Sequence, residues 1–435
     1  MLVDFTVENY RSIKEPVTLS AVAQKQSDRQ TSQSSKRKRV KLDHEIAPGY
    51  HVEGWDIELL PVLAIFGANA SGKSNVIQAL DYLLLMMSHG TQETMTLQRI
   101  FKYAKLDPFK LDSISAHTPT KFELRTIFNS TIYTYYLVIN QNHVISENLD
   151  YALNTTKRTR RLFHRQWDER SKNFIWKTGD DFVGSHNQLQ HNIRKNELFI
   201  TTLLKLNINK IESFSDWLRT GWRGINLGNE DLDIASITAV EKTSGFKEVL
   251  EKALNIVRKF DTGLSRIEFQ KKSDVGDYNI YAVHNTHDGN EIHWLFDEES
   301  LGTQRLFQLA FIIVLSLKVG GLFIVDELGT NIHPNIVRSI IRLFQNIKTN
   351  PKRAQLILTS HDNTLQRNNL LRRDQIWFTQ KRPDQSTELY PLTDFHVRND
   401  LAIDKAYLDG RFGAVPFLPS EEEMILQGDE QCQES

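Results

Sequence analysis

One eight-residue segment constrains this chain more than any other. Residues 67–74 read Gly-Ala-Asn-Ala-Ser-Gly-Lys-Ser and fit the phosphate-binding-loop pattern G-x-x-x-x-G-K-[ST]. An apolar run precedes the segment at Pro61 to Phe66, and an apolar-rich run follows it at Val76 to Met87. These runs predict a buried strand and a helix, which is the setting that such a loop requires. The segment therefore predicts an α/β domain that binds a chain of phosphates.

The loop contains specific candidate ligands. Its glycines let the backbone wrap a phosphate chain, and the first amides of the following helix point at that chain. The ammonium group of Lys73 is expected to reach the β- and γ-phosphates, and the hydroxyl of Ser74 is expected to bind Mg²⁺. The candidate nucleotide-binding residues in this segment are Gly67, Asn69, Ser71, Gly72, Lys73, Ser74 and Asn75.

A second segment contains the acids that such a loop needs. Four apolar residues, 322–325, are followed by Asp326 and Glu327. Two adjacent carboxylates after a buried strand are costly unless a cation or hydrogen bonds satisfy them. We expect Asp326 to hold Mg²⁺ and Glu327 to act as the catalytic general base that activates water.

Three further features are weak alone and informative in their order. Ser300 to Gln304 precedes an apolar helix, and a serine, a glycine and a helix N-terminus together favour an anion. Residues 329–333 follow the acids, and Pro334 suits the first turn of the next helix. The run 355–360 predicts another buried strand that ends at His361, whose ring can sense a γ-phosphate by hydrogen bonding.

Composition excludes several other classes of protein. The 435 residues carry 53 Lys and Arg against 54 Asp and Glu, so overall charge does not favour a nucleic-acid coat or a membrane-surface protein. The one cysteine, Cys432, excludes a disulfide framework or a multi-cysteine metal site and fits a reducing compartment. Gly320-Gly321 divides the most apolar stretch, Leu309 to Val325, which predicts a buried helix and a buried strand. We expect no membrane segment and a cytoplasmic protein.

The order of predicted elements indicates a divided domain. Strands alternate with helices near both ends, and the pattern between them is mainly helical. We predict an N-terminal half of the domain at 1–153, a helical insertion lobe at 154–265, a C-terminal half at 266–418 and an acidic tail at 419–435. The predicted fold class is thus α/β, a mixed sheet with flanking helices that is split by a mainly helical lobe.

This constellation resembles the ABC-type ATPase heads of the SMC and RecF class. Ser300 to Gln304 resembles their signature motif, Asp326 and Glu327 resemble Walker B, residues 329–333 resemble the D-loop, and His361 resembles the switch histidine. The resemblance implies ATP and Mg²⁺ as ligands and a homodimer, or a higher homo-oligomer, in which two chains sandwich ATP head to tail. Ser300 and Gly302 of one chain would then face the ATP of the other. It also implies that Arg11 lies near the nucleotide phosphates.

The resemblance extends to bacterial abortive-infection ATPases of the RloA and AbiL type, which are relatives of the OLD and PARIS ATPases. The residues that carry it are the runs 66–75, 299–303 and 407–416. It implies an ATP-driven switch in defence against phage, acting on a separate effector such as a toxin or nuclease, with DNA or a phage protein as the candidate trigger. Only 74 residues follow His361, too few for a Toprim nuclease domain of roughly 100 residues after the ATPase.

Two basic clusters keep a second hypothesis open. Lys36 to Arg39, with Lys41, forms one, and Lys157 to Arg170 forms the other, predicted as a helix face. Such clusters can neutralise phosphates of nucleic acid, although a solvated surface explains them equally simply. The alternative function is therefore a RecF- or SMC-like, ATP-dependent DNA-binding repair protein.

Overall fold

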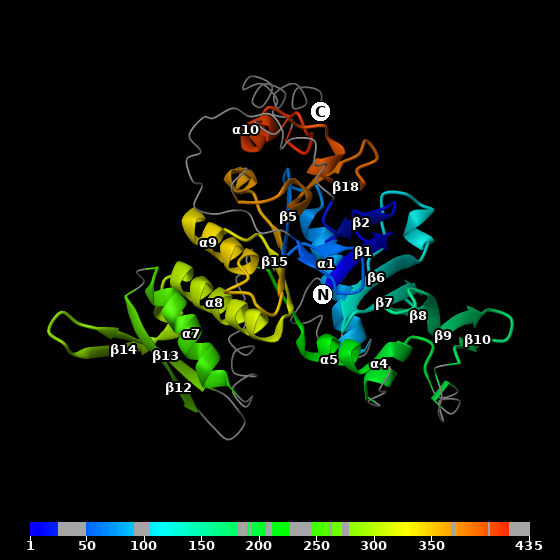
Figure 1. The fold of residues 1–435 in the computed structure, drawn as a ribbon, viewed down its shortest axis with the longest axis horizontal. Helices are drawn as coiled ribbons and strands as arrows, with labels where there is room; N and C mark the ends of the chain where they lie inside the picture. The colour runs from blue at the N-terminus through cyan, green and yellow to red at the C-terminus, as the bar shows by residue number, and fades with distance from the viewer. Residues whose placement is uncertain are drawn as a thin grey trace, which may run out of the picture.

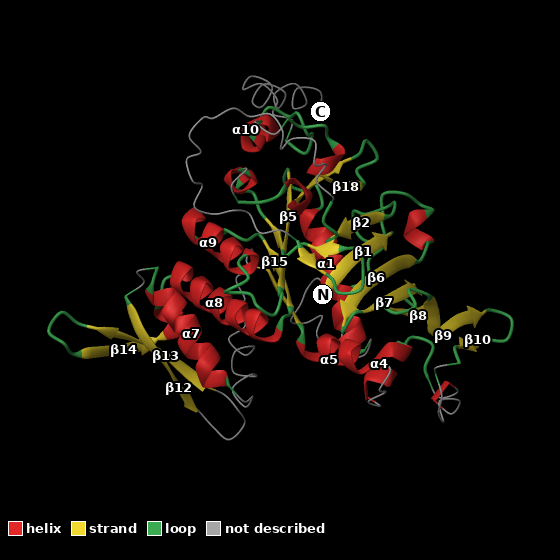
Figure 2. Ribbon diagram, viewed as in Figure 1, coloured by secondary structure: helices red, strands yellow, loops and turns green. Residues whose placement is uncertain are grey.

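The computed structural model describes residues 1–24, 49–90, 105–180, 182, 189–190, 193–205, 211–226, 245–260, 263–271, 278–367, 370–398 and 401–416. Within these residues the fold is mixed α/β, with two large sheets, two small ones, and helices between and beside them (Figures 1 and 2).

The first large sheet has six strands in the order β11-β15-β16-β5-β17-β18. The pairs from β11 to β17 are parallel, and β18 pairs antiparallel with β17. The central strands β5, β15 and β16 are buried throughout, which explains why each is an unbroken apolar run. The bounds are β5 Val62–Gly67, β11 Trp222–Asn226, β15 Leu322–Asp326, β16 Gln355–Thr359, β17 Ile376–Lys381 and β18 Thr387–Pro391.

The second large sheet is antiparallel and has the order β10-β9-β8-β7-β6-β1-β2. The turn between β6 and β7 is made by Asn129 and Ser130, both with positive φ. The bounds are β1 Leu2–Glu8, β2 Val17–Ser20, β6 Thr120–Phe128, β7 Thr131–Ile139, β8 Val144–Leu153, β9 Thr159–Asp168 and β10 Asn173–Thr178. A separate hairpin joins β3 Tyr50–His51 to β4 Glu58–Leu59.

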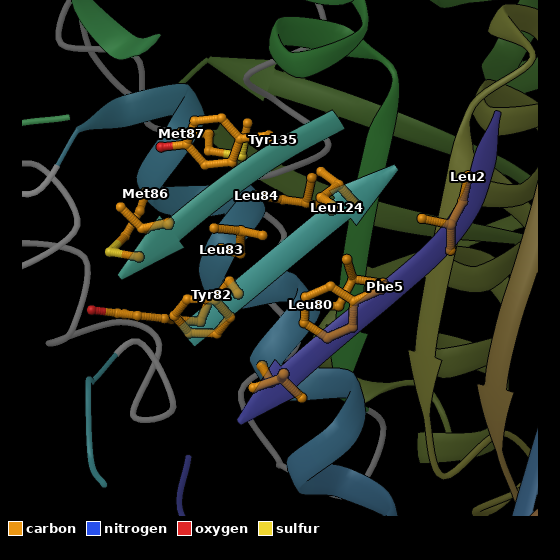
Figure 3. Close-up of a cluster of buried hydrophobic side chains, with 14 of the residues drawn as sticks. Leu2, Phe5, Leu80, Tyr82, Leu83, Leu84, Met86, Met87, Leu124 and Tyr135 are labelled. Atoms are coloured by element: carbon orange, nitrogen blue, oxygen red, sulfur yellow. The ribbon is translucent and has the colours of Figure 1, made fainter. Parts of the chain in front are cut away.

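Helix α1, Lys73–His89, lies between the two large sheets. Its apolar side chains pack against β1, β6 and β7 of the antiparallel sheet (Figure 3). The same buried cluster includes Leu63, Ile65 and Ile357 from the parallel sheet. Because α1 begins where β5 ends, this packing fixes the phosphate-binding loop between the two layers.

The remaining helices cover the sheets. Helices α4, Phe199–Lys205, and α5, Glu212–Thr220, pack against α1, whereas α9, Pro334–Gln345, and α10, Ile403–Leu408, lie on the other face of the parallel sheet. Helices α7, Phe246–Arg258, and α8, Leu301–Val319, pack together on a three-stranded sheet of β12 Leu264–Lys271, β13 Tyr278–Asn285 and β14 Glu291–Leu295 (Figure 1). Short 3-10 helices are η1 Ser115–His117, η3 Phe296–Glu298, η4 Asn363–Gln366, η5 Arg373–Gln375 and η6 Leu392–Asp394.

The predicted division of the stretch Leu309 to Val325 is confirmed. Helix α8 ends at a left-handed Gly320, and the buried strand β15 follows. By length and composition α8 could cross a membrane, but 61% of its apolar window is buried inside the protein. That burial is typical of a core helix in a folded domain.

The described part of residues 154–265, which the sequence predicts to be mainly helical, contains strands as well as helices. β9 and β10 extend the antiparallel sheet, β11 forms the edge of the parallel sheet, and α4, α5 and α7 lie between or after them. The strand pattern of β9 is hidden because its first three residues are exposed and a charged residue, Arg165, occupies a fully buried position. The predicted acidic tail, 419–435, lies outside the described residues.

Candidate nucleotide-binding site

The phosphate-binding loop connects the carboxyl end of β5 to the N-terminus of α1. Gly72 is the residue before α1 and has a φ of 106°, a left-handed conformation that glycine adopts without strain. A Cβ atom at Gly72 would lie 2.0 Å from Oγ1 of Thr387, so the loop also lies tightly against β18. Ser71 Oγ hydrogen-bonds Thr379 Oγ1 at 2.6 Å, and Thr387 Oγ1 donates to Ser71 O at 3.0 Å. Strands β17 and β18 therefore hold the loop in shape.

Lys73 is held inside the loop. Its Nζ donates hydrogen bonds of 2.9 Å to the carbonyl oxygens of Gly67 and Ala68. Burial lowers the pKa of the Lys73 ammonium group, while the charges of Asp326 and Glu327 act in the opposite direction. A cation that is bound only to neutral carbonyls can turn to phosphate oxygens without breaking an ion pair.

Asp326 at the end of β15 lies beside the start of α1. Its Oδ1 accepts a hydrogen bond from Ser74 Oγ at 3.1 Å and another from Thr359 Oγ1 at 2.6 Å. The carboxylate is 2% exposed, and burial raises its pKa, although these two hydrogen bonds act in the opposite direction. The structure thus brings together the serine and the aspartate that the sequence assigns to Mg²⁺.

Glu327, the residue after Asp326, has a strained backbone conformation. Its φ is 59°, a left-handed value that is unusual for glutamate, and its N–H donates to Thr359 Oγ1 at 2.7 Å. Thr330 Oγ1 donates to Glu327 Oε2 at 3.4 Å, which connects the acid to the following loop. A single hydroxyl, that of Thr359, therefore fixes both adjacent acids.

His361 lies two residues beyond β16 and is exposed. Burial lowers the pKa of its ring, and the charge of Lys73 lowers it further, while Glu327 and Asp326 raise it. Because these charges act on His361, the residue belongs to the same end of the sheet as the loop and the acids. A neutral imidazole there can donate one hydrogen bond and accept another.

The N-terminal turn packs against the loop and α1. Asn75 Nδ2 donates to Ser12 Oγ at 2.5 Å, and Ser12 Oγ hydrogen-bonds Thr387 Oγ1 at 2.7 Å. The neighbouring Arg11, with a φ of 51°, hydrogen-bonds Gln78 of α1 through its guanidinium group. Arg11 is thus placed against the helix that starts at the phosphate-binding loop.

Ser300 and Gly302 lie at the N-terminus of α8. Ser300 is the N-cap, and its Oγ accepts a hydrogen bond from Thr303 N at 3.1 Å. A Cβ atom at Gly302 would lie 3.4 Å from Asn331 O, so this end of α8 adjoins the loop that follows Glu327. Buried Arg305 reaches the same loop, with Nη1 3.5 Å from Thr330 O. Among the described residues, no hydrogen bond joins Ser300 or Gly302 to the phosphate-binding loop.

The residues present fit ATP and Mg²⁺. Ser74 and Asp326 place a hydroxyl and a carboxylate oxygen 3.1 Å apart, and oxygen donors of these types are those that Mg²⁺ prefers. The N-terminus of a 17-residue helix, with Lys73 as its first residue, faces the same place and favours phosphate. Ser74 and Asp326 would hold the cation, and the loop amides with Lys73 would hold the phosphates.

Sequence reasoning missed the hydroxyl residues that support these groups. Thr359 fixes both acids, and Thr379, Thr387 and Ser12 brace the loop. Two of these residues could have been recognised from their positions in the sequence. Thr359 ends the buried strand β16, which pairs with the strand that carries the acids, and Thr379 ends the buried part of β17. Ser12 and Thr387 gave no such signal, since 375 positions separate the two residues.

The second basic cluster is not the helix face that was predicted. Its central part lies on β9, where Arg165 has no exposed surface and pairs with buried Glu147 through Nη2 at 2.6 Å. Phe163 is also fully buried, so neither residue can contact nucleic acid. Exposed basic residues remain just before β9, at Arg158, and at its start, at Arg160 and Arg161. The first basic cluster, Lys36 to Arg39 with Lys41, lies outside the described residues.

Comparison with known proteins gives one family and several similar folds. The family model described as "AAA domain, putative AbiEii toxin, Type IV TA system" matches residues 62–367, from the strand before the loop to beyond His361. No curated protein matches the chain. The SMC head domain from Thermotoga maritima is 11% identical with a TM-score of 0.40 and covers 90% of this chain and 98% of that one. An SmcHead bound to the C-winged helix domain of ScpA is 13% identical with a TM-score of 0.44, covering 94% and 99%.

Proposed function

The chain belongs to the AAA-domain family of the AbiEii type, and on that premise we propose that it is an ATP-binding and ATP-hydrolysing switch of a bacterial system of defence against phage. In this proposal the protein acts in the cytoplasm, dimerises head to tail around ATP and controls a separate effector protein, a toxin or nuclease. The family supports nucleotide binding and a toxin–antitoxin context. The closer relation to RloA- and AbiL-type ATPases remains a prediction from the sequence.

One observation carries the ATPase part of the proposal. Ser74, Asp326 and Thr359 form a continuous hydrogen-bonded set at one end of the parallel sheet, with Lys73 and Glu327 beside it. Residues from β5, β15 and β16 meet there because the carboxyl ends of parallel strands share one edge. A merely structural cluster would not need two acids and a lysine at the start of a helix.

The residues divide the chemical work. Bound ATP with Mg²⁺ supplies the phosphate that is transferred to water and the cation that neutralises it. Lys73 and the amides at the start of α1 bind and orient the phosphates. Ser74 and Asp326 hold the cation, Glu327 accepts the proton of the attacking water, and His361 donates a hydrogen bond toward the γ-phosphate.

The exposed end of α8 supports the dimer part of the proposal. Ser300 caps this helix, and Leu301 beside it is 60% exposed. The positive end of the helix dipole favours an anion, which the ATP of a second chain would supply. ATP would then bind across two chains, and its hydrolysis would release them, which makes the assembly a switch.

Purified variants test the proposal. Glu327→Gln should lower ATP turnover by about 10²–10⁴-fold, because it removes the general base, while ATP still drives dimer formation. Lys73→Ala should abolish both, because it removes the cation that binds the phosphates. Exposed Glu251→Gln on α7 serves as the control and should leave both unchanged. The measurements are phosphate release and mass by light scattering, and normal turnover by Glu327→Gln would contradict the assignment of the base.

A native pull-down tests the effector part. The tagged chain should co-purify with a second protein whose retention changes between ATP and ADP. If DNA alone is retained, with an affinity that falls steeply with salt, the alternative of a DNA-binding repair protein would be favoured. Arg160→Glu with Arg161→Glu would then be expected to abolish that binding.

A further inference from the structure

A buried carboxylate immediately precedes the N-cap of α8. The Glu299 side chain is 7% exposed, and its Oε1 accepts a hydrogen bond from Trp294 Nε1 at 2.8 Å. His284 Nε2 hydrogen-bonds the same oxygen, and since an ionised carboxylate can only accept, the imidazole donates. The two rings stack with their centroids 4.3 Å apart and their planes 24° apart. Glu299 is therefore held by side chains of β13 and β14.

The position of this carboxylate has an electrostatic consequence. Glu299 is adjacent to Ser300, and a helix N-terminus attracts any nearby anion, including a carboxylate of the same chain. A free carboxylate there would compete with a phosphate and repel it. Gln304 fixes the intervening backbone, because its Nε2 donates to Glu299 O at 2.8 Å and its N–H donates to Ser300 O at 3.0 Å. The side chain of Glu299 is thereby kept on the side of the three-stranded sheet.

We propose that His284 and Trp294 are positioning residues that hold the Glu299 carboxylate away from the Ser300 end of α8, so that this end can bind the phosphate of ATP carried by a second copy of the chain. The inference rests on the proposed function. It assigns a task to the three-stranded sheet, which contributes both rings and is separate from the sheet that carries the phosphate-binding loop.

A set of variants in the Glu327→Gln background tests this inference. His284→Ala leaves the carboxylate without one of its donors, and the affinity of the ATP-dependent dimer should fall about tenfold. ATP binding to the monomer should not change, because Lys73 and the loop are untouched. Adding Glu299→Gln to His284→Ala removes the negative charge and should restore dimer affinity. Dimer affinity is measured by analytical ultracentrifugation, and monomer binding with a fluorescent ATP analogue at low protein concentration.

His293→Ala is the matched control. His293 lies on the neighbouring part of β14, is 40% exposed, and is 3.5 and 3.8 Å from Glu268 and Glu291, so its loss should leave dimer affinity unchanged. Unaltered affinity in His284→Ala would overturn the inference, and so would a loss that Glu299→Gln does not restore, since that loss would be structural. Failure of the Glu327→Gln chain itself to dimerise with ATP would overturn the proposed function together with the inference.

Discussion

Glu147 and Asp326 are both buried carboxylates, and their surroundings differ in kind. Glu147 on β8 has no exposed surface and pairs with Arg165, which is equally buried. Its two oxygens also accept hydrogen bonds of 2.7–3.0 Å from four donors, Tyr135 Oη, Arg165 Nε, Phe199 N and Ile200 N. The carboxylate is therefore neutralised within the chain.

Asp326 is nearly as buried, and it accepts hydrogen bonds from the neutral hydroxyls of Ser74 and Thr359. The cation whose charge acts on it, Lys73, directs its hydrogen bonds to loop carbonyls instead. A buried carboxylate that is served by hydroxyls is suited to a cation from solution, whereas one that is paired inside the chain stabilises the fold. This difference distinguishes a candidate cation-binding site from a structural ion pair.

The largest expected effect lies at the structural pair. Arg165→Met should lower the free energy of unfolding by about 3–5 kcal/mol, because it leaves Glu147 charged and buried without its cation. ATP turnover per folded molecule should not change, since β9 does not contribute to the site. Urea unfolding measures the first quantity and phosphate release the second.

Arg161→Met is the control for that experiment. Arg161 lies on the same strand, is exposed, and is 3.8 Å from Asp150, so its loss should cost at most about 1 kcal/mol. Equal losses for the two variants would show that Arg165 and Glu147 are not the special pair that their burial indicates.

The next effect lies at the candidate cation site. Asp326→Asn should reduce Mg²⁺-dependent ATP turnover by about 10²–10³-fold, because an amide does not carry the charge that holds the cation. Asp150→Asn on the antiparallel sheet, where the carboxylate is half-buried, should leave turnover unchanged. If Asp326→Asn kept its turnover at low Mg²⁺ concentration, the two buried carboxylates would not differ in the proposed way.

A smaller effect is expected at the hydroxyl that fixes both acids. Thr359→Val removes the donor to Asp326 Oδ1 and the acceptor of the Glu327 N–H, which should cost about 1–3 kcal/mol in stability and lower turnover as well. Thr359→Ser keeps the hydroxyl and should retain most of the turnover. Equal turnover in the two variants would show that the hydroxyl of Thr359 does not determine turnover.

The sequence predicted the candidate nucleotide-binding site better than the buried ion pair of Arg165 and Glu147. The loop at 67–74 and the acids at 326–327 follow runs of apolar residues, so local spacing placed them at the ends of two buried strands, and the structure has these strands, β5 and β15, on either side of β16 in one sheet. Thr359 was missed because a threonine at a strand end is common. Its importance depends on pairing between strands, which spacing along the chain does not reveal.

The pair of Arg165 and Glu147 misled the sequence reasoning. A buried arginine interrupts the apolar alternation of β9, so the segment 157–170 looked like a solvated basic helix. The partner lies 18 positions away on β8, and the burying elements include α4, which starts at Phe199. Such burial is a property of tertiary packing, and no local pattern in the chain encodes it.

The smallest effect concerns the stability of the chain without ligands. Removing the charge of Asp326 should raise that stability, whereas removing the cation that pairs with Glu147 should lower it. Burial raises the pKa of Asp326 above its ordinary value of 3.8, so the folded chain holds this proton more tightly than the unfolded chain does. The stability that the proton contributes is fully present below the ordinary pKa and is lost as pH rises through the raised one. At neutral pH the ionised carboxylate therefore costs stability, and Asp326→Asn should raise Tm slightly in the absence of ATP and Mg²⁺.

The advantage of Asp326→Asn should shrink as pH is lowered from 8 toward 4, and it should reverse at pH 7 once ATP and Mg²⁺ are added, because only the unmodified chain then gains stability from binding the cation. Thermal unfolding at several pH values, with and without ligands, measures both changes. A lower Tm for the ligand-free variant at pH 7 would mean that Asp326, like Glu147, is already neutralised within the chain, and the distinction between the two carboxylates would fail.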